Sequence, residues 1–200
     1  MKFTLGYIEH NEQLFNKYLS NSINEIRENI DVIKYPSLTG CPAAIYNKII
    51  KDSPNRYIIF THEDIIFNNK LIDQINNTIK LVGTFGVLGL VGKNETGKQI
   101  WSNINTLHKY NTVDCCFFII DKTNNIEFDE LTFNGLHKYA EDYAMQCIKN
   151  KLINYSILSN CHATQKDITH ISYTCRTVGY KWGDWPIYHN LFNKKWKNKI

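Results

Sequence analysis

Short apolar runs alternate with segments of helical periodicity over the first 90 residues of this 200-residue chain. The pattern predicts strands at 3–8, 31–35, 55–61 and 84–91, and helices at 14–26, 42–51 and 71–81. Strands that alternate with helices form parallel sheets, because each helix carries the chain back to the same end of the sheet. We therefore expect an α/β domain with a mostly parallel central sheet flanked by helices.

The second half of the chain continues the pattern with strands at 113–121 and 153–158 and a helix at 137–151. The last 40 residues are aromatic and basic, and we expect them to be irregular. Because neither an internal repeat nor a linker divides the chain, we expect a single domain over residues 1–200.

Composition narrows the class of protein. Hydrophobic residues make up 43% of the chain, which is typical of a globular protein. The net charge of +4 is too mild for a dedicated nucleic-acid binder. None of the six cysteines forms a CxxC pair, which argues against a zinc knuckle, and three lie in apolar runs as thiols in a reducing compartment do. No apolar stretch approaches the roughly 20 residues of a spanning helix, so we expect a cytoplasmic protein.

The strongest chemical signal lies where the strand at 55–61 runs into His62, Glu63 and Asp64. In open α/β sheets, ligands bind beyond the carboxyl ends of the strands. A carboxylate such as that of Asp64 could hold Mg²⁺ or Mn²⁺ there, and the ion would bridge a diphosphate. The alternative is an ordinary polar loop in which Asp64 caps the next helix.

Further titratable groups follow in the second half. Glu141 and Asp142 are adjacent within the expected helix, and a carboxylate at a pocket edge can take a proton from an attacking hydroxyl. An exposed acidic pair is the alternative. His162 follows the late strand and could ligate a metal, although a histidine there can also be structural.

These signals belong to a longer series of motifs, and in chain order the series is Ala44-Ile45-Tyr46-Asn47, His62-Glu63-Asp64, the glycine-rich run 83–89, Val113-Asp114, Phe128-Asp129-Glu130, Glu141-Asp142, His162 and Lys195-Trp196. The series resembles glycosyltransferase family 2, of the GT-A fold. It is most similar to the small glycosyltransferases whose metal motif follows a histidine. The resemblance covers nearly the whole chain and implies a hexosyltransferase of glycan or glycoconjugate synthesis.

The resemblance also implies roles for individual residues. Asp64 would bind Mn²⁺ or Mg²⁺ with the donor diphosphate, His162 would complete the coordination, and Asp142 would be the catalytic base of an inverting transfer. The donor half would be about 1–112 and the acceptor and catalytic half about 113–200. The donor-binding residues would be Tyr7, Ile8, Glu9, Tyr35, Asn47, His62, Glu63 and Asp114.

The partners implied are a nucleotide-sugar donor of the UDP, GDP or dTDP type and a glycan, protein or lipid-linked acceptor, with no nucleic acid. Near the C-terminus, Trp182, Trp185 and Trp196 accompany four lysines, 194, 195, 197 and 199. Aromatic rings stack on sugars and lysines attract anionic lipid, which predicts a peripheral membrane contact. A solvated tail explains the lysines equally well.

Two other functions remain open from the sequence. The first acidic position of the usual Asp-x-Asp motif is His62, so the chain could be a degenerate module that binds a nucleotide-sugar or glycan without turnover. Residues 92–98 fit the first seven positions of a phosphate-binding loop of an NTPase or kinase. Gln99 stands where that loop needs a hydroxyl to hold Mg²⁺, so we favour a surface hairpin for this segment.

Overall fold

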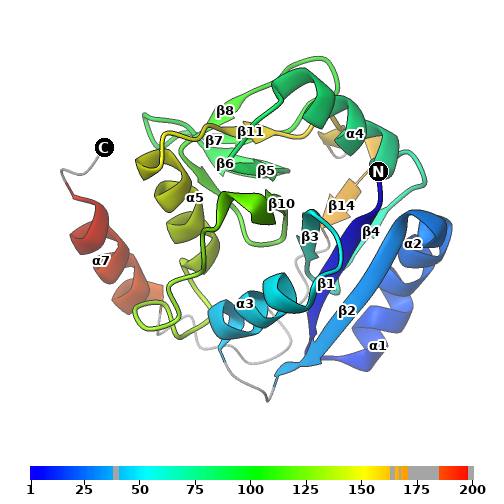
Figure 1. The fold of residues 1–200 in the computed structure, drawn as a ribbon, viewed down its shortest axis with the longest axis horizontal. Helices are drawn as coiled ribbons and strands as arrows, with labels where there is room; N and C mark the ends of the chain where they lie inside the picture. Colours follow the sequence, from blue (N-terminus) through cyan, green and yellow to red (C-terminus); the bar gives the residue numbers. More distant parts are fainter. Residues whose placement is uncertain (38–40, 163–164, 167, 171–184, 198–200) are drawn as a thin grey trace.

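A seven-stranded sheet forms the centre of the structure, a computed structural model that describes residues 1–37, 41–162, 165–166, 168–170 and 185–197 (Figure 1). The strand order is β2-β1-β3-β10-β5-β11-β8. The strands are β1 (Phe3–Glu9), β2 (Ile30–Pro36), β3 (Tyr57–Thr61), β5 (Val87–Gly89), β8 (Lys109–Tyr110), β10 (Phe117–Asp121) and β11 (Asn154–Ser156).

Most strands of this sheet point the same way. β1 is parallel to β2 and β3, and β11 is parallel to β5. β10 is antiparallel to both β3 and β5. The strands β1, β2, β3, β5 and β11 therefore all point in one direction. β10 and β8 point in the opposite direction. The expected mostly parallel sheet is confirmed. Because β10 lies between β3 and β5, the regions before and after residue 112 share one sheet.

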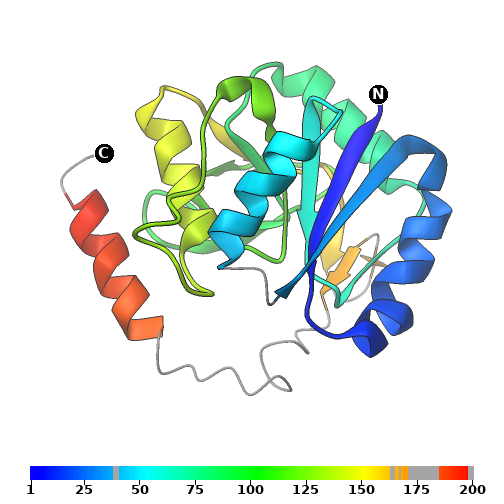
Figure 2. The same cartoon turned by 60° about the horizontal axis from the view of Figure 1, so that its bottom comes forward.

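Helices cover both faces of the sheet (Figures 1 and 2). One face packs against α1 (Glu12–Leu14), the π-helical turn η1 (Phe15–Leu19), α2 (Ser20–Glu25) and α4 (Leu71–Val82). The other face packs against α3 (Pro42–Asp52) and α5 (Tyr139–Lys149). Strand alternation divides the core accordingly: Ile59 belongs to the first cluster, and Ile58 and Phe60 belong to the second.

Two predicted strands are each divided in the structure. The run at 84–91 becomes β5 and β6 (Val91–Lys93), and the run at 113–121 becomes β9 (Thr112–Val113) and β10. β6 pairs with β7 (Gln99–Trp101) and β9 in a separate three-stranded sheet. The segment 92–98 is therefore a hairpin, closed by Asn94, whose side chain accepts the backbone N–H of Lys98 at 2.9 Å. A phosphate-binding loop requires a helix directly after it, and no helix follows this segment.

Short elements complete the described chain. They are β4 (Ile65–Phe67) paired with β14 (Ile168–His170), β12 (Cys161–His162) paired with β13 (Gln165–Lys166), and the 3₁₀ turns η2 (Arg27–Asn29) and η4 (Lys122–Asn124).

The helix α7 (Trp185–Trp196) corrects the expectation of an irregular end. It lies outside α5, on the side of the molecule away from α1 and α2 (Figures 1 and 2). Trp196 is buried, and the aromatic ring of Phe192 lies 6.5 Å from that of Phe133. Trp182 lies outside the described residues. None of the helices in the described part of the chain is long and apolar enough to cross a membrane.

Candidate functional site

The carboxyl ends of β1, β2, β3, β5 and β11 meet at one edge of the central sheet. β10 begins at the same edge, since Phe117 pairs with Thr61, the last residue of β3. The backbone N–H of His62 donates to the carbonyl oxygen of Cys116 at 3.0 Å. The residues just before β10 are thereby fixed beside the end of β3, and ligands of open α/β sheets bind at this kind of edge.

Glu63 ties two loops of this edge together. It is 1% exposed, and its carboxylate accepts the backbone N–H groups of His10 and Asn11 at 2.9 and 3.1 Å. Burial raises the pKa of Glu63 to about 7, although these hydrogen bonds lower it. The Glu63 carboxylate thus shapes the loop between β1 and α1, and its expected contact with the donor stays a prediction.

Asp64 lies fully buried directly before β4. Within the part of the chain that the structure describes, no three His, Cys, Asp or Glu side chains gather into a group that could hold a metal ion. The expected second ligand, His162, lies in β12, but its side chain is outside what the structure describes. A metal ion beside Asp64 would therefore need further oxygen ligands, such as those of a diphosphate.

The remaining donor residues from the first half divide into buried and surface positions. Tyr7 and Ile8 are 1% and 4% exposed, and the Tyr7 ring stacks on Phe15 with centroids 5.2 Å apart. Both side chains belong to the hydrophobic core, and their expected contact with the donor stays a prediction. Glu9 forms an ion pair of 3.0 Å with Lys34. The Tyr35 hydroxyl donates to Asp52 of α3.

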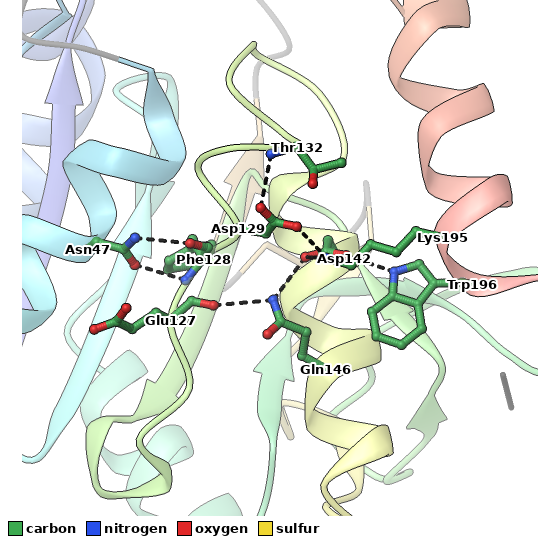
Figure 3. A network of polar contacts seen from close by, with 9 residues as sticks. All are labelled: Asn47, Glu127, Phe128, Asp129, Thr132, Asp142, Gln146, Lys195 and Trp196. Atoms are coloured by element: carbon green, nitrogen blue, oxygen red, sulfur yellow. Dashed lines mark hydrogen bonds and ion pairs between the residues drawn. The ribbon is translucent and has the colours of Figure 1, made fainter.

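Asn47 holds the loop that precedes α5 (Figure 3). Its amide nitrogen donates to the carbonyl oxygen of Phe128 at 3.0 Å, and its amide oxygen accepts the Phe128 N–H at 2.8 Å. The amide nitrogen also lies 3.1 Å from a carboxylate oxygen of Glu130. Asn47 thus joins α3 to the segment that carries Phe128-Asp129-Glu130, and its expected contact with the donor stays a prediction.

Asp142 is fully buried and surrounded by donors, as Figure 3 shows. The indole N–H of Trp196 donates to it at 2.7 Å, the Lys195 ammonium lies 2.8 Å away, and the Gln146 amide donates at 2.9 Å. Burial raises the pKa of Asp142, and Lys195 opposes this effect. The carboxylate expected to act as base is thus engaged by α7, and its role as base stays a prediction.

Asp114 and Glu141 lie together at a small pocket between the three-stranded sheet and the start of α5. The pocket is lined by Val91, Gly92, Lys93, Gln99, Thr112, Val113, Asp114 and Glu141. Burial raises the pKa of Glu141, the nearby charge of Asp114 raises it further, and the Lys138 ammonium 2.8 Å away lowers it. The sequence indicated the pair Glu141-Asp142, but not which of the two faces a pocket.

Comparison with protein-family models and with curated proteins found no match for this chain. Solved structures do match its fold. TarS 1–349 from S. aureus is similar at a TM-score of 0.55 and 15% identity over 80% of this chain. Its complex with UDP-GlcNAc gives 0.54 and 14%, and A197 from STIV gives 0.53 and 12% over 78% of this chain. The fold is glycosyltransferase-like, of the GT-A type. The chain spans 59% of the length of TarS 1–349 and 82% of that of A197.

Proposed function

We propose that this chain is a family 2-like glycosyltransferase that moves a sugar from a nucleotide-sugar donor to an acceptor hydroxyl. The observation that carries the proposal is the set of strand ends on a GT-A-like sheet, where buried Asp64 follows β3 and Asp114 precedes β10. TarS, a glycosyltransferase with the same kind of fold, has been crystallised with UDP-GlcNAc.

The donor would lie across the ends of β1, β2 and β3. Glu63 fixes the backbone of His10 and Asn11 there, so that loop would present a preformed wall to the nucleotide. Asp64 would hold Mn²⁺ or Mg²⁺ together with the donor diphosphate, with His162 as a further ligand. When bound, such an ion would neutralise charge on the departing nucleoside diphosphate.

The proposed reaction is an inverting transfer. The acceptor oxygen forms a bond to the anomeric carbon while the bond from that carbon to the donor phosphate oxygen breaks. Attack from the face opposite the leaving group inverts the anomeric centre, and the hydroxyl proton passes to a carboxylate. The start of α5, with Glu141 and Asp142, would supply that carboxylate.

A thermal-shift screen tests the donor site. UDP-, GDP- and dTDP-sugars are compared, with and without Mn²⁺, on the wild type and on Asp64→Asn. A ligand at a hundred times its Kd adds about 2.7 kcal/mol of stability, which corresponds to a rise in Tm of about 5–10 °C for a chain of this size. We expect this rise with one nucleotide class, and its loss in Asp64→Asn.

The control is Glu12→Gln, which removes an exposed carboxylate next to the same edge. It should respond to donors as the wild type does. A wild type that no donor stabilises under any condition contradicts the proposal.

A binding module without turnover is the second candidate, and His62 in the first acidic position favours it. The measurement is release of nucleoside diphosphate from the donor that gives the thermal shift. Donor binding without any release, even at high enzyme concentration, would decide for the module.

A further inference from the structure

Three segments of the chain meet at the end of the molecule opposite the candidate site. Gly86 directly precedes β5 and Ile153 directly precedes β11, so both lie at the amino ends of these strands. The Gly86 N–H donates to the carbonyl oxygen of Ile153 at 2.9 Å, and the Asn124 amide donates to that of Phe85 at 3.0 Å. Figure 2 shows the C-terminal ends of α4 and α5 at the upper end of the view, on the same side as the N-terminus. The segments 80–86, 122–126 and 148–155 therefore form one surface, which we call the amino-end surface.

The amino-end surface is rich in lysine. Its three segments contain no aspartate or glutamate and four lysines, at positions 80, 122, 149 and 151. Asp121, directly before the second segment, is already paired with Arg56 at 2.7 Å. Glu127, just beyond that segment, is exposed and lies at the border, where its carbonyl oxygen accepts the amide of Gln146. The surface therefore carries a net positive charge.

Two apolar side chains are exposed among these lysines. Leu81 is 64% exposed in the last turn of α4, and Ile153 is 42% exposed. Each has an exposed lysine within two residues, Lys80 in the first case and Lys151 in the second. Aliphatic side chains flanked by lysines are typical of surfaces that rest on a bilayer, because the apolar groups enter the headgroup region while the ammonium groups meet lipid phosphates.

The backbone of Lys151 supports a role for its side chain. Its φ is 62°, in the left-handed region that favours glycine, and the corresponding residue after α4 is indeed a glycine, Gly83, with a φ of 68°. Lys138 also has a positive φ, but its ammonium pairs with Glu141 at 2.8 Å. Lys151 is exposed. A lysine held in a conformation that costs less for glycine points to a use for its charge at the surface.

We propose that the amino-end surface binds the anionic surface of a lipid bilayer, with Leu81 and Ile153 in the headgroup region and the exposed lysines against lipid phosphates. A second copy of this surface is a poorer occupant, because two positive surfaces repel each other. The helix α7, for which the sequence predicted membrane contact, uses Lys195 and Trp196 to hold Asp142. The inference goes beyond the proposed transferase function and does not depend on it.

This contact would turn the ligand edge away from the membrane. The strand β1 connects the two ends of the sheet with seven residues, which span roughly 20 Å at about 3.3 Å per residue. That separation exceeds the Debye length of about 8 Å at physiological ionic strength. Donor binding should therefore be the same on and off the membrane.

The first experiment is cosedimentation with lipid vesicles. The wild type should bind vesicles of phosphatidylcholine that contain about 30% phosphatidylglycerol, and it should not bind phosphatidylcholine alone. Salt at about 1 M should release it, because the Debye length then falls to about 3 Å. Lys80→Gln, Lys149→Gln and Lys151→Gln together should weaken binding about a hundredfold, since each lysine near an anionic surface contributes about fivefold.

A second set of variants separates position from net charge. Lys70→Gln, Lys194→Gln and Lys197→Gln together remove the same charge from three exposed lysines outside the amino-end surface, and this matched control should bind within about threefold of the wild type. Leu81→Ser with Ile153→Ser should weaken binding about tenfold and leave its salt dependence unchanged. All of these positions are exposed, so each variant should keep the far-UV circular dichroism of the wild type.

Three results would overturn the inference. The first is a wild type that does not bind the anionic vesicles. The second is an equal loss of binding in the two triple-lysine variants, which would mean that net charge alone attracts the protein. The third is a loss confined to the control variant, which would place the contact elsewhere. The donor thermal shift is measured without lipid, so failure of every donor would refute the transferase function and leave vesicle binding unaffected.

Discussion

Removal of the Lys195 ammonium should expose the cost of burying Asp142. Lys195→Met keeps most of the aliphatic side chain but deletes the charge that lies 2.8 Å from a fully buried carboxylate. The same ammonium also contacts Asp129 at 2.7 Å and helps to hold the pKa of that carboxyl at about 2. The variant therefore loses both ion pairs, and the Asp142→Asn background separates the buried one.

The expected loss is about 3 kcal/mol. Deleting one partner of a buried ion pair typically costs about 3–5 kcal/mol, because the remaining charge is left in a poorly solvated site. Asp142 keeps its hydrogen bonds from Trp196 and Gln146, and it can take up a proton, so the low end of this range applies. For a chain of this size, that loss lowers Tm by about 6–12 °C.

The loss should also depend on pH. Burial already raises the pKa of Asp142, and removal of the Lys195 charge should raise it further. A group whose pKa is raised in the folded state destabilises that state when it ionises, so stability falls as pH rises through that pKa. The gap between the variant and the wild type should therefore widen as pH rises above the ordinary range of an aspartate carboxyl.

Urea unfolding, followed by tryptophan fluorescence and by far-UV circular dichroism, measures the difference. Lys194→Met is the matched control, since it removes an exposed lysine from the same helix and should change stability by less than about 0.5 kcal/mol. In an Asp142→Asn background, Lys195→Met should cost only about 1 kcal/mol, because the buried charge is gone. Equal losses in both backgrounds, or a loss in Lys195→Met no larger than in the control, would refute the reasoning.

Three further perturbations follow from the structure. Asn47→Ala removes both hydrogen bonds to the Phe128 backbone and should lower the free energy of unfolding by about 1–3 kcal/mol in urea titrations. Gly86→Ala should cost at least about 2 kcal/mol in the same assay, because the added Cβ would lie 2.5 Å from the Cβ of Cys147. Lys98→Ala should leave the thermal shift with any nucleotide unchanged, because residue 98 closes a hairpin.

Each of these has an outcome that would contradict it. Lys48→Ala changes the next residue of α3, which is exposed, and should leave stability nearly unchanged. If Asn47→Ala had no larger effect than Lys48→Ala, the hydrogen bonds of Asn47 to the Phe128 backbone would not stabilise the fold. Gly83→Ala meets no atom within 4 Å and should cost only about 1 kcal/mol for its positive φ of 68°. Loss of nucleotide binding in Lys98→Ala would revive the phosphate-loop function.

The central layers of the fold could be predicted because their signals are local and strong. The strand expected at 55–61 is observed at Tyr57–Thr61, and the helix expected at 71–81 at Leu71–Val82. Continuous apolar runs indicate burial but not where a strand bends. The run at 84–91 was therefore predicted as one strand. In the structure the Leu90 N–H donates to the carbonyl oxygen of Phe117, and the next residues join another sheet.

The helix α7 could not be predicted for a different reason. Its one buried residue is Trp196. The indole of Trp196 donates a hydrogen bond to Asp142, which lies 54 residues earlier in the chain. Its other apolar residues alternate with Asn, His and Lys, which gives a weak periodic signal. Tertiary contact, not local pattern, sets the position of this helix.

For the candidate site, the sequence indicates an edge of the sheet, and the structure adds how the side chains there are engaged. Tyr7 lies in the core and Glu63 accepts backbone N–H groups, which no local pattern predicts. Asp142 and Glu141 are adjacent in the sequence, and only the position of α7 shows which one is enclosed. The sequence pattern indicates which edge of the sheet carries polar residues, and packing decides which way each side chain points.

The bond between Asp142 and α7 has a consequence for how the chain is made. A ribosome adds about 5–20 residues per second, so the 54 residues between Asp142 and Trp196 take roughly 3–10 s to synthesise. Once residue 156 has been added, every strand of the central sheet exists, while the start of α5 still lacks the lysine and the indole that neutralise and cover its carboxylate. The nascent sheet must therefore keep this corner hydrated until α7 emerges, which makes the docking of α7 the closing event of folding.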